Sequence, residues 1–270
     1  MKLNIWHVDA FAHRPFAGNP AAVVPLAEWL ADETMQAIAA ENNLSETAFF
    51  VARASGRYDL RWFSPAAEVE LCGHATLASA FVVLTELAPQ LGEVRFSTRS
   101  GVLTVAKGAE GLLCMSLPAD EVVPFAPPDG FAGRLGASLC VSPPAEFHSG
   151  RYLMAVWRSA RDIREMKFGP DLAPSLREAG KWGLAATAQD EAPYDFVSRF
   201  FAPDMGVNED PVTGSAHCAL APFWAKRLGK KTLRAYQASA RGGELLCTDE
   251  GGRVTLSGPC ALYLRGVIEV

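Results

Sequence analysis

The composition of the chain is that of an ordinary folded protein with an acidic surface. It has 270 residues, of which 49% are hydrophobic and 20% charged, and its formal net charge is −5. This balance excludes a mainly disordered chain. Net negative charge offers no electrostatic attraction to a polyanion, so we expect no nucleic-acid partner.

Neither end of the chain nor its interior predicts export or membrane insertion. His7 and Asp9 interrupt any apolar run near the N-terminus, which argues against a signal peptide. The longest apolar stretch, near 78–84, is too short to cross a bilayer. The six cysteines show no paired spacing, which is typical of reduced thiols. We therefore expect a cytoplasmic protein with no membrane partner.

The first half of the chain predicts short strands around one apolar helix. Alternating apolar and polar residues predict a strand over 3–8. Asp32 is predicted to cap a helix that ends near Glu41. Residues 74–87 are apolar on nearly all sides, which predicts a helix buried within its own half. Further strands are predicted at 21–24, 60–63, 94–97 and 102–105.

The second half begins after a stretch rich in proline and glycine. This stretch, 120–144, is predicted to be a linker. Residues 215–228 have the same apolar character as 74–87 and predict a second buried helix. Pro222 is expected to kink or shift that helix.

Four segments of the first half recur in the second half in the same order. The matched pairs are 61–65 with 199–203, 72–75 with 213–216, 99–101 with 241–243 and, more weakly, 43–48 with 183–188. A crevice between two related domains is a favoured ligand site. We therefore predict one half at 1–120, which the last strand (261–270) is a candidate to join, and another at 130–260, with the active site in the cleft between them.

Gly73 and Gly214 each precede one of the two predicted apolar helices. A helix N-terminus presents unpaired N–H groups and partial positive charge, and glycine lets a ligand approach the backbone closely. Two such helix starts predict a binding site for a carboxylate. The alternative is ordinary capping, with Ser215 as the N-cap of the second helix.

Glu46 is the clearest difference between the two halves, because its counterpart in the repeat is Ala186. A carboxyl group in a half-buried pocket has a raised pKa and can serve as a general acid and base. A capping or salt-bridged glutamate is the alternative interpretation.

Three further residues are candidates for chemistry. Asp210 precedes a proline, which enforces extended backbone that could aim the carboxylate into the cleft, although an Asx-turn or a cap is an equal alternative. His74 could bind substrate or pass a proton, although a histidine at a helix start is often structural. Cys72 at a helix start is expected to have a lowered thiol pKa and to be reactive. His217 and Cys218 are predicted to lie in the core.

Metal ions and nucleotide cofactors find no support in the sequence. The histidines show no ligand spacing, and no glycine-rich phosphate loop is present. We therefore predict a protein that needs neither a metal nor a cofactor.

Four blocks of the sequence together resemble the signature of the phenazine-biosynthesis (PhzF-like) isomerase family. They are 16–20 (FAGNP), 43–47 (NLSET), 72–76 (CGHAT) and 209–216 (EDPVTGSA). The resemblance implies the diaminopimelate-epimerase-like α+β fold, in which two pseudo-symmetric halves each form a curled, mostly antiparallel sheet around a central helix. It also implies a homodimer.

The resemblance implies catalytic roles for Glu46 as acid and base and for His74 and Asp210. Its implied substrate-binding residues are Asn19, Cys72, Gly73, Gly214 and Ser215. Related epimerases use two cysteines at the two helix starts, but Thr213 stands opposite Cys72 in the repeat. A threonine hydroxyl is too weak an acid and base for that role. The chain also departs from the family at 240–243, where members often carry Gly-Arg-Pro.

The sequence thus favours a cofactor-independent isomerase that moves a proton between carbons of a small substrate bearing a carboxylate. Two alternatives stay open. One is an amino-acid epimerase or racemase that uses Cys72 with a carboxylate, and the other is a non-catalytic protein that binds a small molecule in the same cleft. The sequence does not name the substrate.

Overall fold

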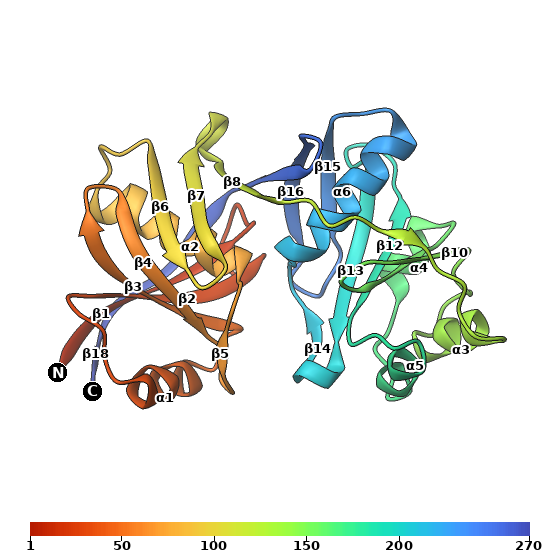
Figure 1. Ribbon diagram of the computed structural model, residues 1–270, viewed down its shortest axis with the longest axis horizontal. Helices are drawn as coiled ribbons and strands as arrows, with labels where there is room; N and C mark the ends of the chain where they lie inside the picture. The colour runs from red at the N-terminus through yellow and green to blue at the C-terminus, as the bar shows by residue number, and fades with distance from the viewer. The chain divides into compact units, whose positions relative to one another are not determined.

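The computed structural model describes all 270 residues and divides the chain into two compact units. Unit 1 comprises Met1–Leu117 and Thr255–Val270, and unit 2 comprises Pro118–Val254 (Figure 1). The predicted linker at 120–144 lies within unit 2 and contains the helix α3 (Phe131–Ser138). That prediction was wrong because Phe131 anchors the segment in a hydrophobic core, while its prolines and glycines only separate short elements.

Unit 1 consists of curled strands with two α-helices. The strands are β1 (Lys2–Ala10), β2 (Asn19–Leu26), β3 (Glu46–Ala54), β4 (Arg57–Phe63), β5 (Glu68–Val69), β6 (Glu93–Thr98), β7 (Gly101–Lys107), β8 (Leu113–Pro118) and β18 (Cys260–Glu269). The helices are α1 (Asp32–Asn42) and α2 (Gly73–Val82), and α2 continues as a π-helical turn over Val83–Leu87. The strands and the apolar helix expected from the sequence are confirmed.

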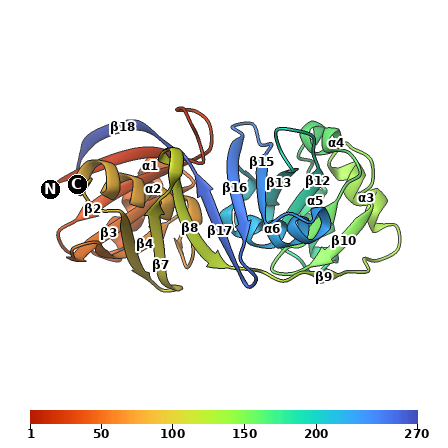
Figure 2. The same ribbon diagram turned by 90° about the horizontal axis from the view of Figure 1, so that it is seen from above.

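Helix α2 is the core element of unit 1. All of its residues except Gly73 and Phe81 are buried, and it packs on β1, β2 and β3 (Figure 2). An all-apolar helix has no polar face to turn to water, so strands cover it on several sides. This packing brings the first turn of α2 to the beginning of β3.

The start of α1 differs from the prediction. Its N-cap residue is Ala31, and Asp32 is the first helical residue with no capping hydrogen bond. The Asp32 carboxylate instead accepts a hydrogen bond of 2.8 Å from Arg61 on β4. Asp32 thus binds a charged residue distant in sequence and does not cap the backbone of α1. The local sequence does not reveal such a partner.

Unit 2 combines β-strands with four α-helices. The strands are β9 (Val123–Pro124), β10 (Glu146–Ser149), β11 (Leu153–Val156), β12 (Leu184–Gln189), β13 (Phe196–Ala202), β14 (Val207–Asp210), β15 (Thr232–Gln237) and β16 (Gly243–Asp249), and β17 (Arg253–Gly258) begins in unit 2 and continues into unit 1. The helices besides α3 are α4 (Ala160–Glu165), α5 (Leu172–Glu178) and α6 (Gly214–Leu228). Pro222 lies within α6, which continues to its C-cap at Gly229.

The strand pairings follow the same order in the two units. In unit 1, β2 runs parallel to β3, β3 antiparallel to β4, β4 parallel to β6, and β6 antiparallel to β7. In unit 2, β11 runs parallel to β12, β12 antiparallel to β13, β13 parallel to β15, and β15 antiparallel to β16. Helices α2 and α6 occupy the same place in the order of elements. The sequence matches therefore fall on elements of the same type and pairing.

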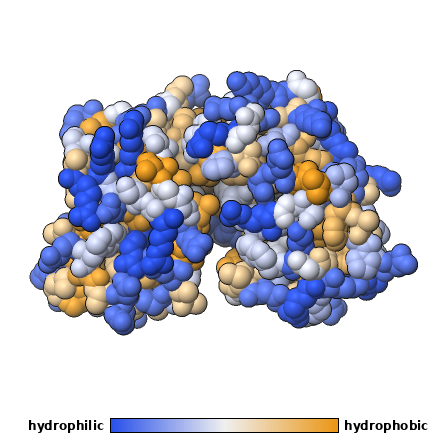
Figure 3. Space-filling model, viewed as in Figure 1, coloured by the Kyte–Doolittle hydropathy of each residue, from blue (hydrophilic) through white to orange (hydrophobic).

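On the face drawn in Figure 3, hydrophilic residues cover most of the surface and apolar residues are scattered among them. No helix combines the length and the apolar character that a membrane span requires.

The turn before β2 depends on Gly18. Its φ is +63°, and a Cβ added there would lie 2.1 Å from the carbonyl oxygen of Ala10. The next residue, Asn19, begins β2, whose Ala21 pairs with Glu46 on β3. The glycine thus sets the path of a strand that positions a candidate site residue.

We expect Gly18→Ala to lower the free energy of unfolding by about 3 kcal/mol, because it adds a backbone clash to an unfavourable φ. Gly111→Ala is the matched control, since Gly111 has φ +77° and no atom within 4 Å of an added Cβ. The control should cost only about 1 kcal/mol in urea unfolding. Equal losses in the two variants would show that the contact with Ala10 is unimportant.

Candidate active site

Three of the predicted site residues of unit 1 lie against one another. Glu46 is the first residue of β3, and Cys72 and His74 are the N-cap and second residue of α2. His74 Nε2 lies 3.0 Å from Glu46 Oε2, and Cys72 Sγ lies 3.5 Å from His74 Nδ1. The histidine therefore stands between a carboxylate and a thiol.

The cluster is mostly withdrawn from water but remains open at the glutamate. The His74 side chain is 7% exposed and that of Glu46 is 19% exposed. Glu46 Oε2 is itself buried and receives no well-directed hydrogen bond, so its close contact with His74 is chiefly a charge contact. An ionised oxygen that lacks directed donors retains its capacity to accept a proton.

The environment of His74 favours the imidazolium. Burial lowers the pKa of the imidazole, but the close contacts of the ring with Cys72 and with the Glu46 carboxylate outweigh burial and hold the pKa well above its ordinary value. The contact is thus an ion pair of the Glu46 carboxylate with a cation held on a rigid helix. Such a cation orients the carboxylate.

The expectation of a lowered thiol pKa at Cys72 was wrong. Burial, and then the charge of Glu46, raise the pKa of the Cys72 thiol to about 11, which outweighs the opposing effect of His74. A helix start lowers a thiol pKa only where desolvation is small. At neutral pH Cys72 is a thiol, a poor base for abstracting a proton from carbon.

Asn19 and Gly73 lie in the same unit. Asn19 is fully buried at the start of β2, where it pairs with Ala10 of β1, and Gly73 is the first residue of α2. Both remain candidates for substrate binding.

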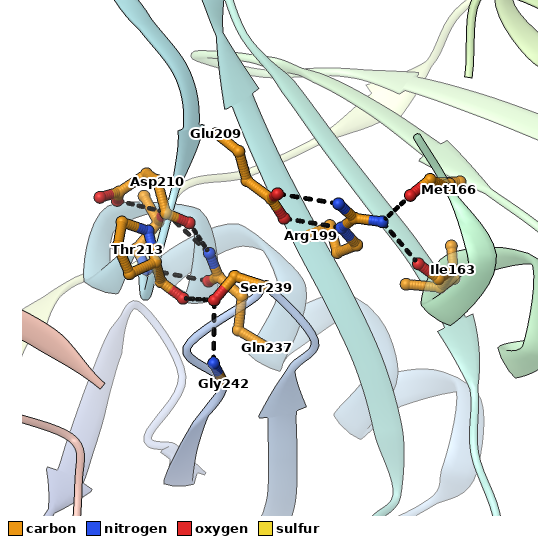
Figure 4. Close-up of polar contacts among 10 residues, drawn as sticks. Ile163, Met166, Arg199, Glu209, Asp210, Thr213, Gln237, Ser239 and Gly242 are labelled. Atoms are coloured by element: carbon orange, nitrogen blue, oxygen red, sulfur yellow. Dashed lines mark hydrogen bonds and ion pairs between the residues drawn. The ribbon is translucent and has the colours of Figure 1, made fainter. Parts of the chain in front are cut away.

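Asp210, a predicted residue of unit 2, lies beside Thr213, the N-cap of α6 (Figure 4). The Thr213 hydroxyl donates to the Asp210 carboxylate at 2.5 Å, and the Thr213 N–H donates to Gln237 Oε1 at 2.8 Å. Gln237 donates in turn to the Asp210 carbonyl at 2.7 Å. Asp210 is half-buried and fixed in this network. Sequence reasoning missed Gln237, which no motif marks, although a polar residue within an apolar strand was a signal.

Ser215 does not cap α6. The N-cap is Thr213, Gly214 is the first helical residue, and the Ser215 hydroxyl lies 2.8 Å from the Tyr152 hydroxyl. Tyr152 is buried against Phe200 and was not identified from the sequence, because it lies on a distant segment. The capping interpretation of Ser215 was therefore wrong, and its hydroxyl belongs to a tyrosine–serine pair.

A buried arginine supports the strand that carries Asp210. Arg199 on β13 makes two hydrogen bonds, of 2.6 and 2.8 Å, to the Glu209 carboxylate on β14 (Figure 4). It also donates to the carbonyls of Ile163 and Met166. In unit 1, Arg61 binds Glu68 with the same two-pronged geometry, at 2.7 and 2.8 Å.

His217, in the first turn of α6, is buried in the core, as predicted, and Cys218 beside it is also buried. His217 Nδ1–H donates to the Thr213 carbonyl at 2.8 Å, and Nε2 lies 3.4 Å from the Ser198 hydroxyl. Burial lowers the pKa of His217 to about 4. The imidazole is thus neutral and helps to hold Thr213 in place.

This lowered pKa predicts acid sensitivity. Because the unfolded chain takes up the His217 proton at a higher pH than the folded chain, stability falls as the pH drops from about 6.5 to about 4. The loss from this group is expected to reach about 3 kcal/mol. In chemical unfolding at several pH values, His217→Asn should show a shallower pH dependence across this range than the parent protein. Parallel curves for the two proteins would contradict the assignment.

The site also offers metal ligands that the sequence spacing did not suggest. One ligand atom each from Glu46, Cys72 and His74 lies within 4.8 Å of the other two. Glu46 is distant in sequence, so a search for local ligand spacing could not find this set.

The comparisons with known proteins agree with the geometry. Residues 8–266 match the family described as phenazine biosynthesis-like protein. The chain is 49% identical, over the full length of both proteins, to a Pseudomonas aeruginosa protein named an uncharacterized isomerase. It is 40% identical to a PhzF-family protein of Enterococcus faecalis, whose crystal structure superposes with a TM-score of 0.90 over 100% of both chains.

A more distant likeness extends the fold assignment. The crystal structure of a hydroxyproline epimerase from Agrobacterium vitis matches with a TM-score of 0.59 at 10% identity, over 99% of this chain and 92% of the other. These matches confirm both the expected fold class and the sequence resemblance. The chain therefore belongs to the PhzF-like family of phenazine biosynthesis-like proteins.

Proposed function

We propose that the protein is an isomerase that moves a proton between two carbons of a small carboxylate-bearing substrate, with Glu46 as the acid and base. The observation that carries this proposal is the buried, weakly solvated Oε2 of Glu46 beside the His74 imidazolium. Family membership and the isomerase name of a close relative support the reaction class.

The chemistry follows from the charges of the cluster. The Glu46 carboxylate takes a proton from a substrate carbon, and the resulting carboxylic acid returns it to another carbon of the same molecule. The His74 cation, 3.0 Å away, orients the carboxylate and is placed to stabilise negative charge that develops on the substrate. No redox change accompanies the shift.

The helix starts supply a further part of the proposal. Gly73 and Gly214 begin α2 and α6, and the first N–H groups of a helix have no partner within it. We propose that these starts, with Asn19 and the Ser215 hydroxyl, bind polar and carboxylate groups of the substrate. Asp210 is proposed to act through the Thr213 hydroxyl that it holds.

The epimerase alternative has weaker physical support. It needs a second base, and the pKa of the Cys72 thiol, near 11, makes that residue a poor one. The corresponding position in unit 2 is a threonine, whose hydroxyl is committed to Asp210.

The test begins with a thermal-shift screen of small cyclic and amino-bearing carboxylic acids. Each stabilising compound is then incubated with the protein in D2O and followed by NMR. A product of unchanged mass apart from deuterium, with a moved double bond, supports the isomerase. Deuterium at an existing stereocentre without a new product, abolished by Cys72→Ser, would support the epimerase. Recovery of every ligand unchanged and unlabelled would support a binding protein.

We also propose a homodimer. Light scattering at micromolar concentration should give twice the 29.0 kDa chain mass, and a monomer mass would refute this part of the proposal.

A further inference from the structure

Glu46, Cys72 and His74 combine three kinds of side chain that bind transition metals. A carboxylate, a thiol and an imidazole are the ligand types of zinc sites in proteins. All three offer a ligand atom within one small volume, and the Glu46 oxygen that faces the others receives no well-directed hydrogen bond. We propose that this cluster binds a thiolate-seeking divalent metal ion, Zn²⁺ first among them, and that the bound ion blocks proton transfer at Glu46.

The spacing of the ligand atoms is close to that of a zinc site. Ordinary zinc–ligand bonds in a tetrahedron place nitrogen and oxygen roughly 3.4 Å apart and nitrogen and sulfur roughly 3.6 Å apart. Here His74 Nε2 lies 3.0 Å from Glu46 Oε2 and 4.0 Å from Cys72 Sγ. Both distances lie within about 0.4 Å of these values.

The charges of the three ligands also permit a divalent metal ion to replace the protons of the cluster. Coordination requires Cys72 as a thiolate and His74 as a neutral imidazole, so binding releases the protons that these groups carry to solvent and forms bonds from the metal to sulfur, nitrogen and oxygen, with no transfer of electrons. The carboxylate, the thiolate, the neutral imidazole and the divalent cation sum to zero, so no net charge is buried.

The ligand set determines which ions bind. Thiolate and imidazole select zinc, cobalt, cadmium and copper, whereas Mg²⁺ and Ca²⁺ prefer all-oxygen sites. Three protein ligands leave a fourth position, and the 19% exposed Glu46 side chain marks the side from which the ion enters. The metal site rests on ligand geometry and does not depend on the proposed isomerase reaction, although inhibition does.

Cobalt provides a probe for this site that requires no substrate. Co²⁺ titrated into the protein should bind one ion per chain and produce the near-ultraviolet absorption of a cobalt–thiolate bond. Zn²⁺ should abolish the absorption, and a large excess of Mg²⁺ should not. Cys72→Ser should lose the absorption, whereas Cys140→Ser, at an exposed cysteine outside the cluster, should keep it. Absence of the absorption in the parent protein, or its persistence in Cys72→Ser, would overturn the proposal.

Glu46→Gln provides a second, conservative variant should Cys72→Ser fail to fold. It should keep the thiolate absorption and weaken Co²⁺ binding at least about tenfold, as loss of one ligand does; unchanged affinity would overturn the three-ligand site. The outcomes separate the two proposals. Cobalt binding with the thiolate signature in a protein whose Glu46→Gln variant still turns over refutes only the isomerase mechanism. Loss of turnover in that variant without cobalt binding by the parent refutes only the metal site.

Discussion

Glu46→Gln should lower turnover of the substrate at least about a hundredfold, because it removes the group that accepts and returns the proton. The substitution preserves the size of the side chain and its position at the start of β3. Substrate binding should therefore change much less than turnover, which initial rates over a range of substrate concentrations will show.

Glu41→Gln is the matched control for this change. Glu41 is exposed on α1, outside the cluster of Glu46 and His74, and its substitution should leave turnover unchanged. Circular dichroism and thermal unfolding establish that both variants are folded. Full turnover in Glu46→Gln would exclude this residue as the acid and base.

Arg199→Met should lower the free energy of unfolding by about 3 kcal/mol, because it leaves a carboxylate and two carbonyls without their donor. The Arg199 side chain is 9% exposed and that of its partner Glu209 is 20% exposed. The guanidinium also lies over the Phe201 ring, 5.2 Å from its centre, and this contact is lost as well. Urea unfolding measures the change.

Arg177→Met gives the comparison for an exposed pair. Arg177 binds Asp204 with side chains 59% and 29% exposed, and its loss should cost less than about 1 kcal/mol. Similar losses in the two variants would show that burial of Arg199 contributes little. Because Glu209 precedes Asp210, the Arg199 variant should also weaken the hydrogen-bond network of Thr213.

Much of the fold follows from local patterns in the sequence. The apolar run at 74–87 could only form a buried helix, and alternating residues identified β1 before any contact was known. The errors came from partners distant in sequence. Asp32 was expected to cap a helix but binds Arg61, and the alternative interpretation of Ser215 as an N-cap fails because its hydroxyl contacts Tyr152.

The candidate site was only partly accessible from the sequence. Glu46, Cys72 and His74 could each be named, but their mutual contact depends on how α2 packs on β2 and β3. The same packing raises the pKa of the Cys72 thiol, which its position at a helix start was expected to lower. Desolvation by burial outweighs the effect of the helix start. Gln237 and Tyr152 carry no motif, and only the tertiary structure shows what they touch.

The central claim is that a single carboxylate both removes and returns the proton. A substrate deuterated at the donor carbon, converted in a single turnover in H2O, tests it most directly. We predict that a measurable fraction of the product carries deuterium at the new carbon, because the label stays on Glu46 between the two steps. A product with no deuterium above background would contradict the account.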